Sequence, residues 1–431
     1  MEKTIHPRKV PYLLVSDNKG NLFEDETKEL VGRTGNDFVQ LKPTDFIEMP
    51  DGSEFFTLPD RNPVFFNKEK NKFDILENKN AVAAFVAPAH TQLYLSAYKK
   101  RDKAVILPLY NYTAVGWLDD KFWVAATRVD KSKRQDCDQF HQEIIIRNAK
   151  DALKKNPSNR LLKHLSHCAL VYLCPAARNY FMGRWEMPVP TSPSCNARCL
   201  GCISYQPKQN CVTSPQIRLN FIPSVAEIVE LTVKHLEEAP LPVASFGQGC
   251  EGEPLMVWEV IRDSIKEIRR QTKKGVININ TNASNPKAIE ELCNAGLDSI
   301  RISMNSVIEE DYNKYYNPVN YSYSDVLKSL EISTGSKIWT SLNYLTFPGL
   351  NDRRSEVDEL KNIIKTKGLS MIQWRNFGID PDWFFEKTQI ANPNDSIGIK
   401  NMMNEIKSES PSITYGYFNP DIATIEKARG R

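Results

Sequence analysis

The chain has 431 residues, of which 41% are hydrophobic and 25% charged, and its formal net charge is +3. This composition is typical of a globular protein of two or three domains, and the net charge is too small to indicate a polyanion partner. The longest apolar run, residues 81–89, is broken by Pro88 and is far too short to span a bilayer. No membrane segment is therefore predicted.

The amino end and the cysteines both favour the cytoplasm. The chain begins with polar and basic residues rather than with the apolar region of an export signal. Its nine cysteines are an odd number, and three of them are clustered, which fits a reducing compartment better than a disulfide framework. We expect a cytoplasmic protein.

Residues 1–130 have the pattern of a β-rich domain. Short apolar runs, such as residues 12–15 and 104–107, are separated by turn residues, such as those at 17–20 and Asp51-Gly52. This alternation is typical of hairpins in a compact β-rich domain. No glycine-rich nucleotide-binding motif follows any of these predicted strands.

Residues 131–187 predict a basic helical connector. Between 131 and 190 there are 11 basic residues against 5 acidic ones, and the apolar residues recur with a helical period. The segment contains several metal-ligand types, namely His141, His164, His167, Cys168 and Cys174. Ligand-type residues scattered over helices are usually structural, so a second metal site is the weaker interpretation here.

Residues 188–385 alternate strand and helix six times. The predicted strands are 188–192, 242–247, 276–282, 298–305, 340–346 and 371–376, each followed by a loop or helix. This rhythm predicts an α/β fold, a partial (β/α)6 TIM-like barrel with right-handed crossovers. Residues 386–431 predict a small C-terminal cap with a helix at 396–408, a strand at 413–418 and a basic tail.

Polar side chains alternate with apolar ones on four of these strands. The polar residues on the predicted inner face are Asn278, Asn280, Asn282, Arg301, Ser303, Asn305, Ser341, Asn343, Gln373 and Arg375. A barrel lumen packed only for stability is filled with branched aliphatic side chains. The pattern therefore predicts a polar interior that holds a ligand near the carboxyl ends of the strands.

Three cysteines lie in the loop after the first predicted barrel strand: Cys195, Cys199 and Cys202. Three closely spaced thiolates can hold three irons of a cubane cluster and leave the fourth iron open to another ligand. Two alternatives remain at this point. Cys211 could close the cluster as a fourth thiolate, or the thiols could hold a structural zinc ion, although the second cysteine pair usual in zinc sites is missing.

The spacing CxxxCxxC, followed by Gly252-Glu253-Pro254, resembles the radical S-adenosylmethionine (SAM) superfamily. The resemblance runs from about residue 188 to about 385. It implies a [4Fe-4S] cluster whose unique iron binds SAM, and an electron donor such as flavodoxin or ferredoxin. It also implies cleavage of SAM to methionine and a 5′-deoxyadenosyl radical that abstracts hydrogen from a substrate. One departure is Gly201, because the family usually has an aromatic residue before the third cysteine, near the adenine.

The resemblance also implies roles for residues at the strand ends. Glu253, with the backbone around Gly252 and Pro254, would receive the amino group of SAM, since a carboxylate suits an ammonium. The other cofactor-binding residues are Asn280 and Asn282 near the ribose, Ser303 and Asn305 near the ribose and carboxylate, and Asn343 and Arg375 on the last two strands. The stretch 343–352 resembles the subgroup with the molybdopterin-synthesis and peptide-maturase enzymes. No cysteine follows Cys293, so the auxiliary C-terminal clusters of that subgroup are not expected.

Cys250 precedes the Gly252-Glu253-Pro254 turn by two residues. Free cysteine is among the most buried residue types, so a structural role is one interpretation. The other is a catalytic thiol that donates a hydrogen atom or holds an intermediate.

The predicted function is that of a radical SAM enzyme with an unidentified substrate, either a peptide or protein or an RNA. A small metabolite is an alternative substrate, and an iron–sulfur protein that only binds or relays electrons is an alternative function. The β-rich domain and the connector are expected to select the substrate. For this, the basic residues of the connector would line one side of the entrance, with Tyr180, Phe181 and Trp185 nearby.

Overall fold

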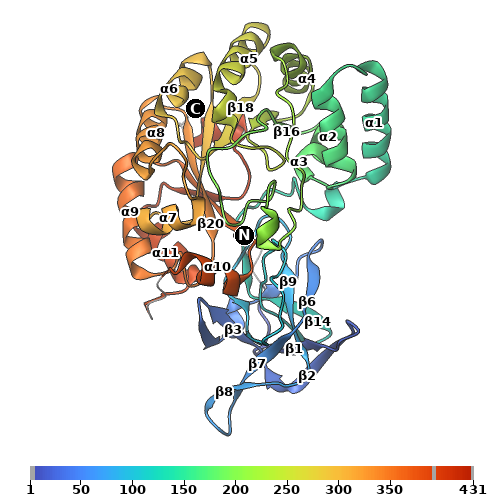
Figure 1. The fold of residues 1–431 in the computed structure, drawn as a ribbon, viewed down its shortest axis with the longest axis vertical. Helices are drawn as coiled ribbons and strands as arrows, with labels where there is room; N and C mark the ends of the chain where they lie inside the picture. Colours follow the sequence, from blue (N-terminus) through green and yellow to red (C-terminus); the bar gives the residue numbers. More distant parts are fainter. Residues whose placement is uncertain (1–4, 391–394, 429–431) are drawn as a thin grey trace.

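A seven-stranded parallel sheet forms the centre of the computed structural model, which describes residues 5–390 and 395–428. The strand order follows the chain, and helices cover the outer side of the curved sheet (Figure 1). The strands are β16 (Glu186–Val189), β17 (Val243–Phe246), β18 (Val276–Thr281), β19 (Ser299–Met304), β20 (Trp339–Thr346), β21 (Met371–Asn376) and β22 (Thr414–Gly416). The predicted partial barrel is confirmed. It has one strand more than expected, because β22, which was assigned to a separate cap, pairs with β21.

Helices follow the strands as the periodicity predicts. They are α4 (Val225–Glu238), α5 (Trp258–Gln271), α6 (Pro286–Ala295), α7 (Glu309–Tyr316), α8 (Tyr323–Gly335), α9 (Arg354–Lys367), α10 (Pro381–Thr388), α11 (Ile399–Glu409) and α12 (Ile422–Ala428). The predicted capping box of α4 is present, with Ser224 and Glu227 bonding to each other's backbone N–H. The sequence did not indicate α7 and α10, which have only eight residues each. The end of the predicted basic tail, 429–431, lies outside the described residues.

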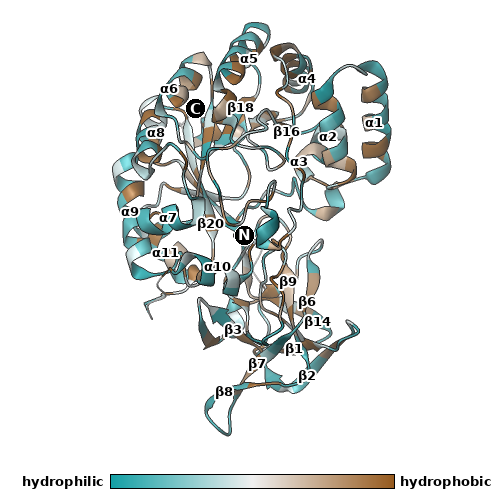
Figure 2. Cartoon of the chain, in the orientation of Figure 1, coloured by the Kyte–Doolittle hydropathy of each residue, from teal (hydrophilic) through white to brown (hydrophobic). Residues whose placement is uncertain are grey.

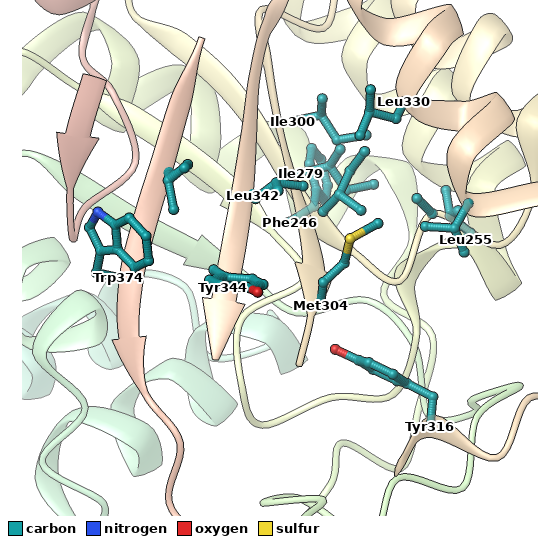
Figure 3. Packing of buried hydrophobic residues seen from close by; sticks show 14 of the residues in the cluster. Phe246, Leu255, Ile279, Ile300, Met304, Tyr316, Leu330, Leu342, Tyr344 and Trp374 are labelled. Carbon is teal, nitrogen blue, oxygen red and sulfur yellow. The ribbon is translucent and has the colours of Figure 1, made fainter. Parts of the chain in front are cut away.

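The core lies between the sheet and the outer helices. Ile279, Ile300 and Leu342, from three neighbouring strands, are completely buried and turn toward the helices (Figure 3). Burying a side chain of this size is worth about 1.5–3 kcal/mol, so this outer layer stabilises the sheet. In Figure 2 the brown, apolar parts of the helices likewise face the sheet.

The inner side of the sheet carries the polar residues of the alternating pattern. Toward the amino ends of the strands these residues bond to one another: Asn278 Nδ2 donates to Ser245 Oγ (2.7 Å), and Ser299 Oγ donates to Asn278 Oδ1 (2.6 Å). Asn419, which follows β22, donates to Glu186 Oε1 (2.7 Å) of β16. These bonds join the first and last strands across the interior. The interior near the amino ends of the strands is therefore a hydrogen-bonded polar network, and the predicted ligand space is confined to the part near the carboxyl ends.

The β-rich region consists of antiparallel sheets. Its strands are β1 (Tyr12–Ser16), β2 (Leu22–Glu29), β3 (Val31–Thr34), β4 (Asp37–Gln40), β5 (Ile47–Glu48), β6 (Glu54–Leu58), β7 (Arg61–Asn67), β8 (Lys72–Ile75), β9 (Asn80–Phe85), β10 (His90–Gln92), β11 (Leu95–Ser96), β12 (Tyr98–Lys100), β13 (Val115–Leu118), β14 (Lys121–Val124) and β15 (Ala126–Arg128). The largest sheet has the order β5-β14-β13-β1-β9-β6, with β2 paired to β1. This confirms a β-rich region before the barrel.

The β-rich region packs against the carboxyl edge of the barrel sheet (Figure 1). Thr91 Oγ1 donates to the carbonyl of Trp374 (2.7 Å), and the backbone N–H of Gln92 donates to Asn376 Oδ1 (2.8 Å). Beside them, Arg61 pairs with Asp380 at the start of α10 at 2.8 Å, and both side chains are completely buried. These contacts fix the β-rich region over the end of the barrel where ligands bind in this class of fold.

Replacing Asp380 with alanine should lower the free energy of unfolding by about 3–5 kcal/mol, because Arg61 would be left as an unpaired buried charge. The backbone N–H of Leu107 would also lose its acceptor. Urea denaturation of the variant would measure the change, with the exposed Asp358→Ala variant as control. A loss below about 1 kcal/mol for Asp380→Ala would contradict this account of the junction.

The connector forms α1 (Gln142–Lys155), α2 (Arg160–Leu170) and α3 (Pro175–Phe181), which pack beside α4 and β16. The predicted apolar stripes are buried, as at Ile145 and Leu165. Trp185 directly precedes β16 and so lies at the amino edge of the sheet, opposite the predicted entrance. The expectation that Trp185 stands near the entrance is therefore wrong.

Within the described ranges, none of the helices combines the length and apolar character needed to cross a bilayer.

Candidate functional site

A cavity of about 480 Å³ opens at the carboxyl edge of the sheet, a size typical of small-molecule sites. It is walled by the loop after β16, by the loop after β17 and by the ends of β18 to β21. The predicted site residues that line it are Cys195, Cys199, Cys202, Gly252, Glu253, Pro254, Asn280, Asn282, Ser303, Asn343 and Arg375. Residues far apart in the sequence thus meet at one opening.

The three cysteines lie in the loop after β16, which is held against α7. The backbone N–H groups of Arg198 and Leu200 donate to the carbonyls of Tyr316 (2.9 Å) and Tyr315 (3.0 Å). Burial raises the pKa of the Cys195 thiol to about 11 and raises the pKa of the Cys199 thiol well above its usual value. Both thiols are therefore neutral at pH 7 unless a metal binds them, since metal ligation requires the thiolate.

Cys202 and Cys211 differ in their surroundings. The Cys202 sulfur lies 3.5 Å from Arg218 Nη2, which donates to it, and 3.6 Å from Ser204 Oγ. Cys211 is exposed, occupies a left-handed backbone position and is not among the residues that line the cavity. Among the described residues that line the cavity, the only thiols are those of Cys195, Cys199 and Cys202.

Gly201 lies at the position where the sequence resemblance leads us to expect an aromatic residue. A side chain there would begin 3.3 Å from Tyr315 Oη and 3.6 Å from the Phe377 ring. These two rings pack edge to face with centroids 4.9 Å apart, and both line the cavity. Aromatic surface is therefore present beside the third cysteine, although it comes from α7 and from the end of β21.

Glu253 is buried at the edge of the cavity. Its carboxylate accepts bonds from the backbone N–H of Asn282 (2.8 Å) and of Leu255 (3.0 Å) and from the Thr281 hydroxyl. Burial nevertheless raises the pKa of Glu253 to about 7. A carboxylate has about four acceptor positions, so one remains for a cationic ligand.

Gly252 brings this turn directly against the cysteine loop. Its N–H donates to the carbonyl of Ser192 (2.7 Å), and a Cβ at this position would meet the carbonyl oxygen of Ser194 at 2.0 Å. Only glycine allows this approach.

Glu251 is a positioning residue that the sequence did not indicate. Its carboxylate accepts bonds from the backbone N–H groups of Thr191 (2.8 Å), Ser192 (2.9 Å) and Gly247 (2.8 Å). It therefore ties the start of the cysteine loop to the loop after β17. Burial raises its pKa to about 7. A glutamate one position before the Gly252-Glu253-Pro254 turn carries no sequence signal of this long-range role.

Replacing Glu251 with alanine should lower the free energy of unfolding by at least about 3 kcal/mol, because each buried N–H left without an acceptor costs about 1–3 kcal/mol. Thermal unfolding of the apoprotein would measure this effect, and iron retention after reconstitution would report on the loop. Glu259→Ala, on an exposed position of α5, is the matched control. Equal stability of the two variants would contradict the positioning role.

The amides on the strand ends differ in how fully they are bonded. Asn280 Nδ2 donates to the carbonyl of Phe246 (2.9 Å), and Asn282 Nδ2 donates to Asn196 Oδ1 (2.9 Å). Asn343 Oδ1 is buried without a hydrogen-bond partner at the cavity wall. Asn305 is completely buried and is not among the residues that line the cavity, so its predicted contact with a ligand is not supported by its position.

Two arginines give the cavity a cationic side. Arg301 Nη1 donates to Gln373 Oε1 (3.1 Å), and Arg375 Nη1 donates to the carbonyl of Tyr417 (2.8 Å). Burial, together with the Arg375 guanidinium, lowers the pKa of Arg301 to about 9. The Nε of Arg301 is buried without a hydrogen-bond partner. Like charges placed together in this way favour an anionic group in the cavity.

The β-rich region supplies part of the wall through Phe85, Leu109, Tyr110 and Asn111. The connector supplies none of the described lining residues, so the expected basic wall is not present. Its arginines have other partners: Arg160 pairs with Glu227 (2.7 Å) and Arg134 with Asp421 (2.7 Å).

Cys250 does not line this cavity. Its sulfur lies 3.2 Å from His164 Nε2 and 3.5 Å from the Cys168 sulfur, both on α2. A direct role for this thiol in hydrogen transfer is therefore not supported by its position, because it points into the interface between the barrel and α2.

The donor set fits an iron–sulfur cluster together with SAM. Three thiols converge on one cavity that exposes no fourth described thiol, and a carboxylate with a free acceptor position lies beside them. The unpartnered Asn343 Oδ1 and Arg301 Nε supply an acceptor and a donor for a polar ligand. Both observations agree with an iron–sulfur cluster that is bound by three protein thiolates and by one small-molecule ligand.

Comparison with known proteins identifies the domain. The model of the radical SAM superfamily matches residues 189–360. The FeMo cofactor biosynthesis protein NifB of Azotobacter vinelandii is 24% identical over 205 residues, which cover 44% of this chain and 39% of NifB. An uncharacterized protein of Methanocaldococcus jannaschii is 29% identical over 119 residues, 27% of this chain and 26% of that protein. The matches thus span about a quarter to two-fifths of the length of these relatives.

Solved structures that match part of this chain include methylornithine synthase, with 13% identity, a TM-score of 0.36 and coverage of 63% of this chain and 78% of that one. A spore photoproduct lyase with bound SAM has 13% identity, a TM-score of 0.37 and coverage of 60% and 95%. Likenesses of this size carry no weight for function.

Proposed function

Residues 189–360 form a radical SAM domain, a class of enzyme domain that uses SAM and an iron–sulfur cluster, and on this premise we propose that the protein cleaves SAM reductively at a [4Fe-4S] cluster. Cys195, Cys199 and Cys202 hold the cluster. When bound, cluster and SAM together supply a 5′-deoxyadenosyl radical that takes a hydrogen atom from the substrate. The observation that carries the proposal is the meeting of three thiols and Glu253 at one cavity.

The chain's own residues then orient the cofactor. Glu253, with the backbone at Gly252 and Pro254, receives the amino group of SAM, since its buried carboxylate has an acceptor position to spare. Asn280 and Asn282 lie nearest to the ribose. Tyr315 and Phe377 replace the missing aromatic residue at position 201 as the surface for the adenine.

The opposite wall handles negative charge and the substrate. Ser303, Asn343 and Arg375 face the carboxylate end of SAM, and Arg301 beside Arg375 favours an anionic group on the substrate. Tyr110 and its neighbours in the β-rich region close the cavity against water, which protects a reactive radical from quenching. The β-rich region is thus the part that selects the substrate. The preference of Arg301 and Arg375 for an anionic group is compatible with a peptide or protein carboxylate and with an RNA phosphate.

A flavodoxin or ferredoxin is the proposed electron donor. The second candidate function is an iron–sulfur protein that relays electrons without turning over SAM.

Reconstituted protein, incubated anaerobically with dithionite and SAM, distinguishes the two functions. Mass spectrometry should detect 5′-deoxyadenosine, formed faster when a cell-extract fraction containing the substrate is added. Reduction of the cluster without any deoxyadenosine, with or without extract, would favour the electron-relay function.

A further inference from the structure

Three metal-ligand side chains meet outside the cavity described above. His164 and Cys168 lie one turn apart on α2, and Cys250 reaches them from the loop after β17. The nitrogen of His164 and the two sulfurs all lie within 4.8 Å of one another. Cys168 and Cys250 are buried, and His164 is half-buried.

Cys174 lies near this group, because it lines a small cavity together with Cys168 and Cys250. The backbone N–H of Cys174 donates to the carbonyl of Cys168 (2.9 Å), so the chain turns back on itself after α2. Leu173, just before it, is exposed and holds a left-handed backbone conformation with φ of 52°. That conformation is unfavourable by roughly 1–2 kcal/mol for a residue other than glycine. The turn is therefore unfavourable on its own, and it places Cys174 beside the same small cavity as Cys168 and Cys250.

The distances fit a single metal ion. The separations are 3.2 Å between His164 Nε2 and the Cys250 sulfur and 3.5 Å between the two sulfurs. A tetrahedral zinc ion, with Zn–S bonds of about 2.3 Å and Zn–N bonds of about 2.0 Å, separates neighbouring ligand atoms by about 3.5–3.8 Å. A disulfide would need sulfurs about 2.0 Å apart.

A small cavity beside the three thiols also has room for a single ion, although His164 is not among the residues that line it. Cys168, Cys174 and Cys250 line a small cavity of about 20 Å³. That is room for about one water-sized body and far too little for a cluster. Gln216, which lines the same cavity, has a buried Oε1 with no hydrogen-bond partner.

We propose that His164, Cys168 and Cys250 bind one Zn²⁺ ion, and that Cys174, from the wall of the adjacent small cavity, supplies the fourth ligand of a closed, structural Cys₃His site. Thiolate and imidazole ligands in tetrahedral geometry select zinc, and a site with four protein ligands leaves no open position for chemistry. Binding releases the thiol protons, and the four ligands supply the whole coordination shell.

The site joins two parts of the protein. α2 belongs to the connector, whereas Cys250 is next to Glu251, which holds the cysteine loop, and two residues before Gly252. The carbonyl of Cys250 also accepts a bond from the backbone N–H of Leu219 (2.8 Å). A metal ion here would fix the connector against the loop that carries Glu251, Gly252 and Glu253. This assigns the connector a structural role, in agreement with its absence from the cavity wall.

The test is metal analysis of the full-length chain, purified anaerobically from zinc-supplemented cells. Inductively coupled plasma mass spectrometry should find about one zinc ion per chain in addition to the iron. Cys168→Ser and Cys250→Ser should each lose the zinc and keep the iron. Cys293→Ser, at a half-buried cysteine on α6, should keep both metals. Less than about a tenth of a zinc ion per wild-type chain, or full zinc in Cys168→Ser, would overturn the proposal.

A second readout does not depend on how those variants fold. The variant C195A/C199A/C202A lacks the cluster thiols, and Co²⁺ added to it should produce strong visible d–d bands and a thiolate-to-cobalt charge-transfer band. Adding Zn²⁺ should abolish both. Weak, octahedral cobalt spectra, or a Cys168–Cys250 disulfide found in peptides from freshly purified, alkylated protein, would contradict the site. Because this variant cannot hold the cluster, the result is independent of the proposed radical SAM function.

Discussion

Replacing any one of Cys195, Cys199 or Cys202 with alanine is expected to abolish binding of the iron–sulfur cluster and all SAM cleavage. A cubane held by only two thiolates is not retained, and the described residues that line the cavity include no fourth thiol to replace the lost one. Iron and sulfide analysis after anaerobic reconstitution, together with the visible absorption of the cluster, would measure the loss.

Cys211→Ala is the matched control, because Cys211 is exposed, is not among the described residues that line the cavity and lies nine residues after Cys202 in the sequence. It should retain iron, sulfide and SAM cleavage at wild-type levels. Iron loss in Cys211→Ala equal to that in the other three variants would show that the cluster is closed by four thiolates and has no position for SAM.

The second large effect is expected for Glu253→Gln, which should weaken SAM binding at least about 30-fold. Removing one partner of a buried, hydrogen-bonded charge pair costs about 2 kcal/mol or more, and 1.4 kcal/mol corresponds to tenfold in affinity. Isothermal titration of the reconstituted protein with SAM would measure the change, and iron content would show that the fold and cluster are intact.

Glu290→Gln, on an exposed position of α6, provides the comparison for that titration. If Glu253→Gln bound SAM as tightly as Glu290→Gln while both kept their iron, the amino group of SAM would have to be held elsewhere.

Local periodicity was sufficient to predict the barrel. Strand parity placed Ile279 and Ile300 on the helix side and Asn280 and Ser303 on the inner side, and all four lie where the parity predicts. The seventh strand was assigned to a separate cap, because residues 413–418 follow a helix that does not reveal which sheet edge the chain returns to. Pairing with β21 depends on tertiary structure that a local pattern does not contain.

The candidate site was predictable where residues are close in sequence or lie at strand ends. The cysteine motif, the Gly252-Glu253-Pro254 turn and the polar strand ends converge on one cavity because carboxyl ends of parallel strands share an edge. Asn305 follows the same parity but comes after the last residue of β19, where the chain has left the strand, and its side chain turns into protein.

Long-range partners were not predictable. The role of Glu251 depends on backbone N–H groups about sixty residues earlier, and Cys250 meets His164 across 86 positions. Similarly, nothing in residues 109–111 indicated that they would form part of the cavity wall. Such contacts arise only when the β-rich region and the connector pack against the barrel, so a single sequence gives no local signal for them.

Electron paramagnetic resonance of the reduced, reconstituted protein tests the central claim most directly, namely that three thiolates leave one iron for SAM. The spectrum of the reduced [4Fe-4S] cluster should change shape when SAM is added in excess, and the change should be lost in Glu253→Gln at the same SAM concentration. A cluster spectrum that stays the same with and without SAM in the wild-type protein would contradict an open coordination position.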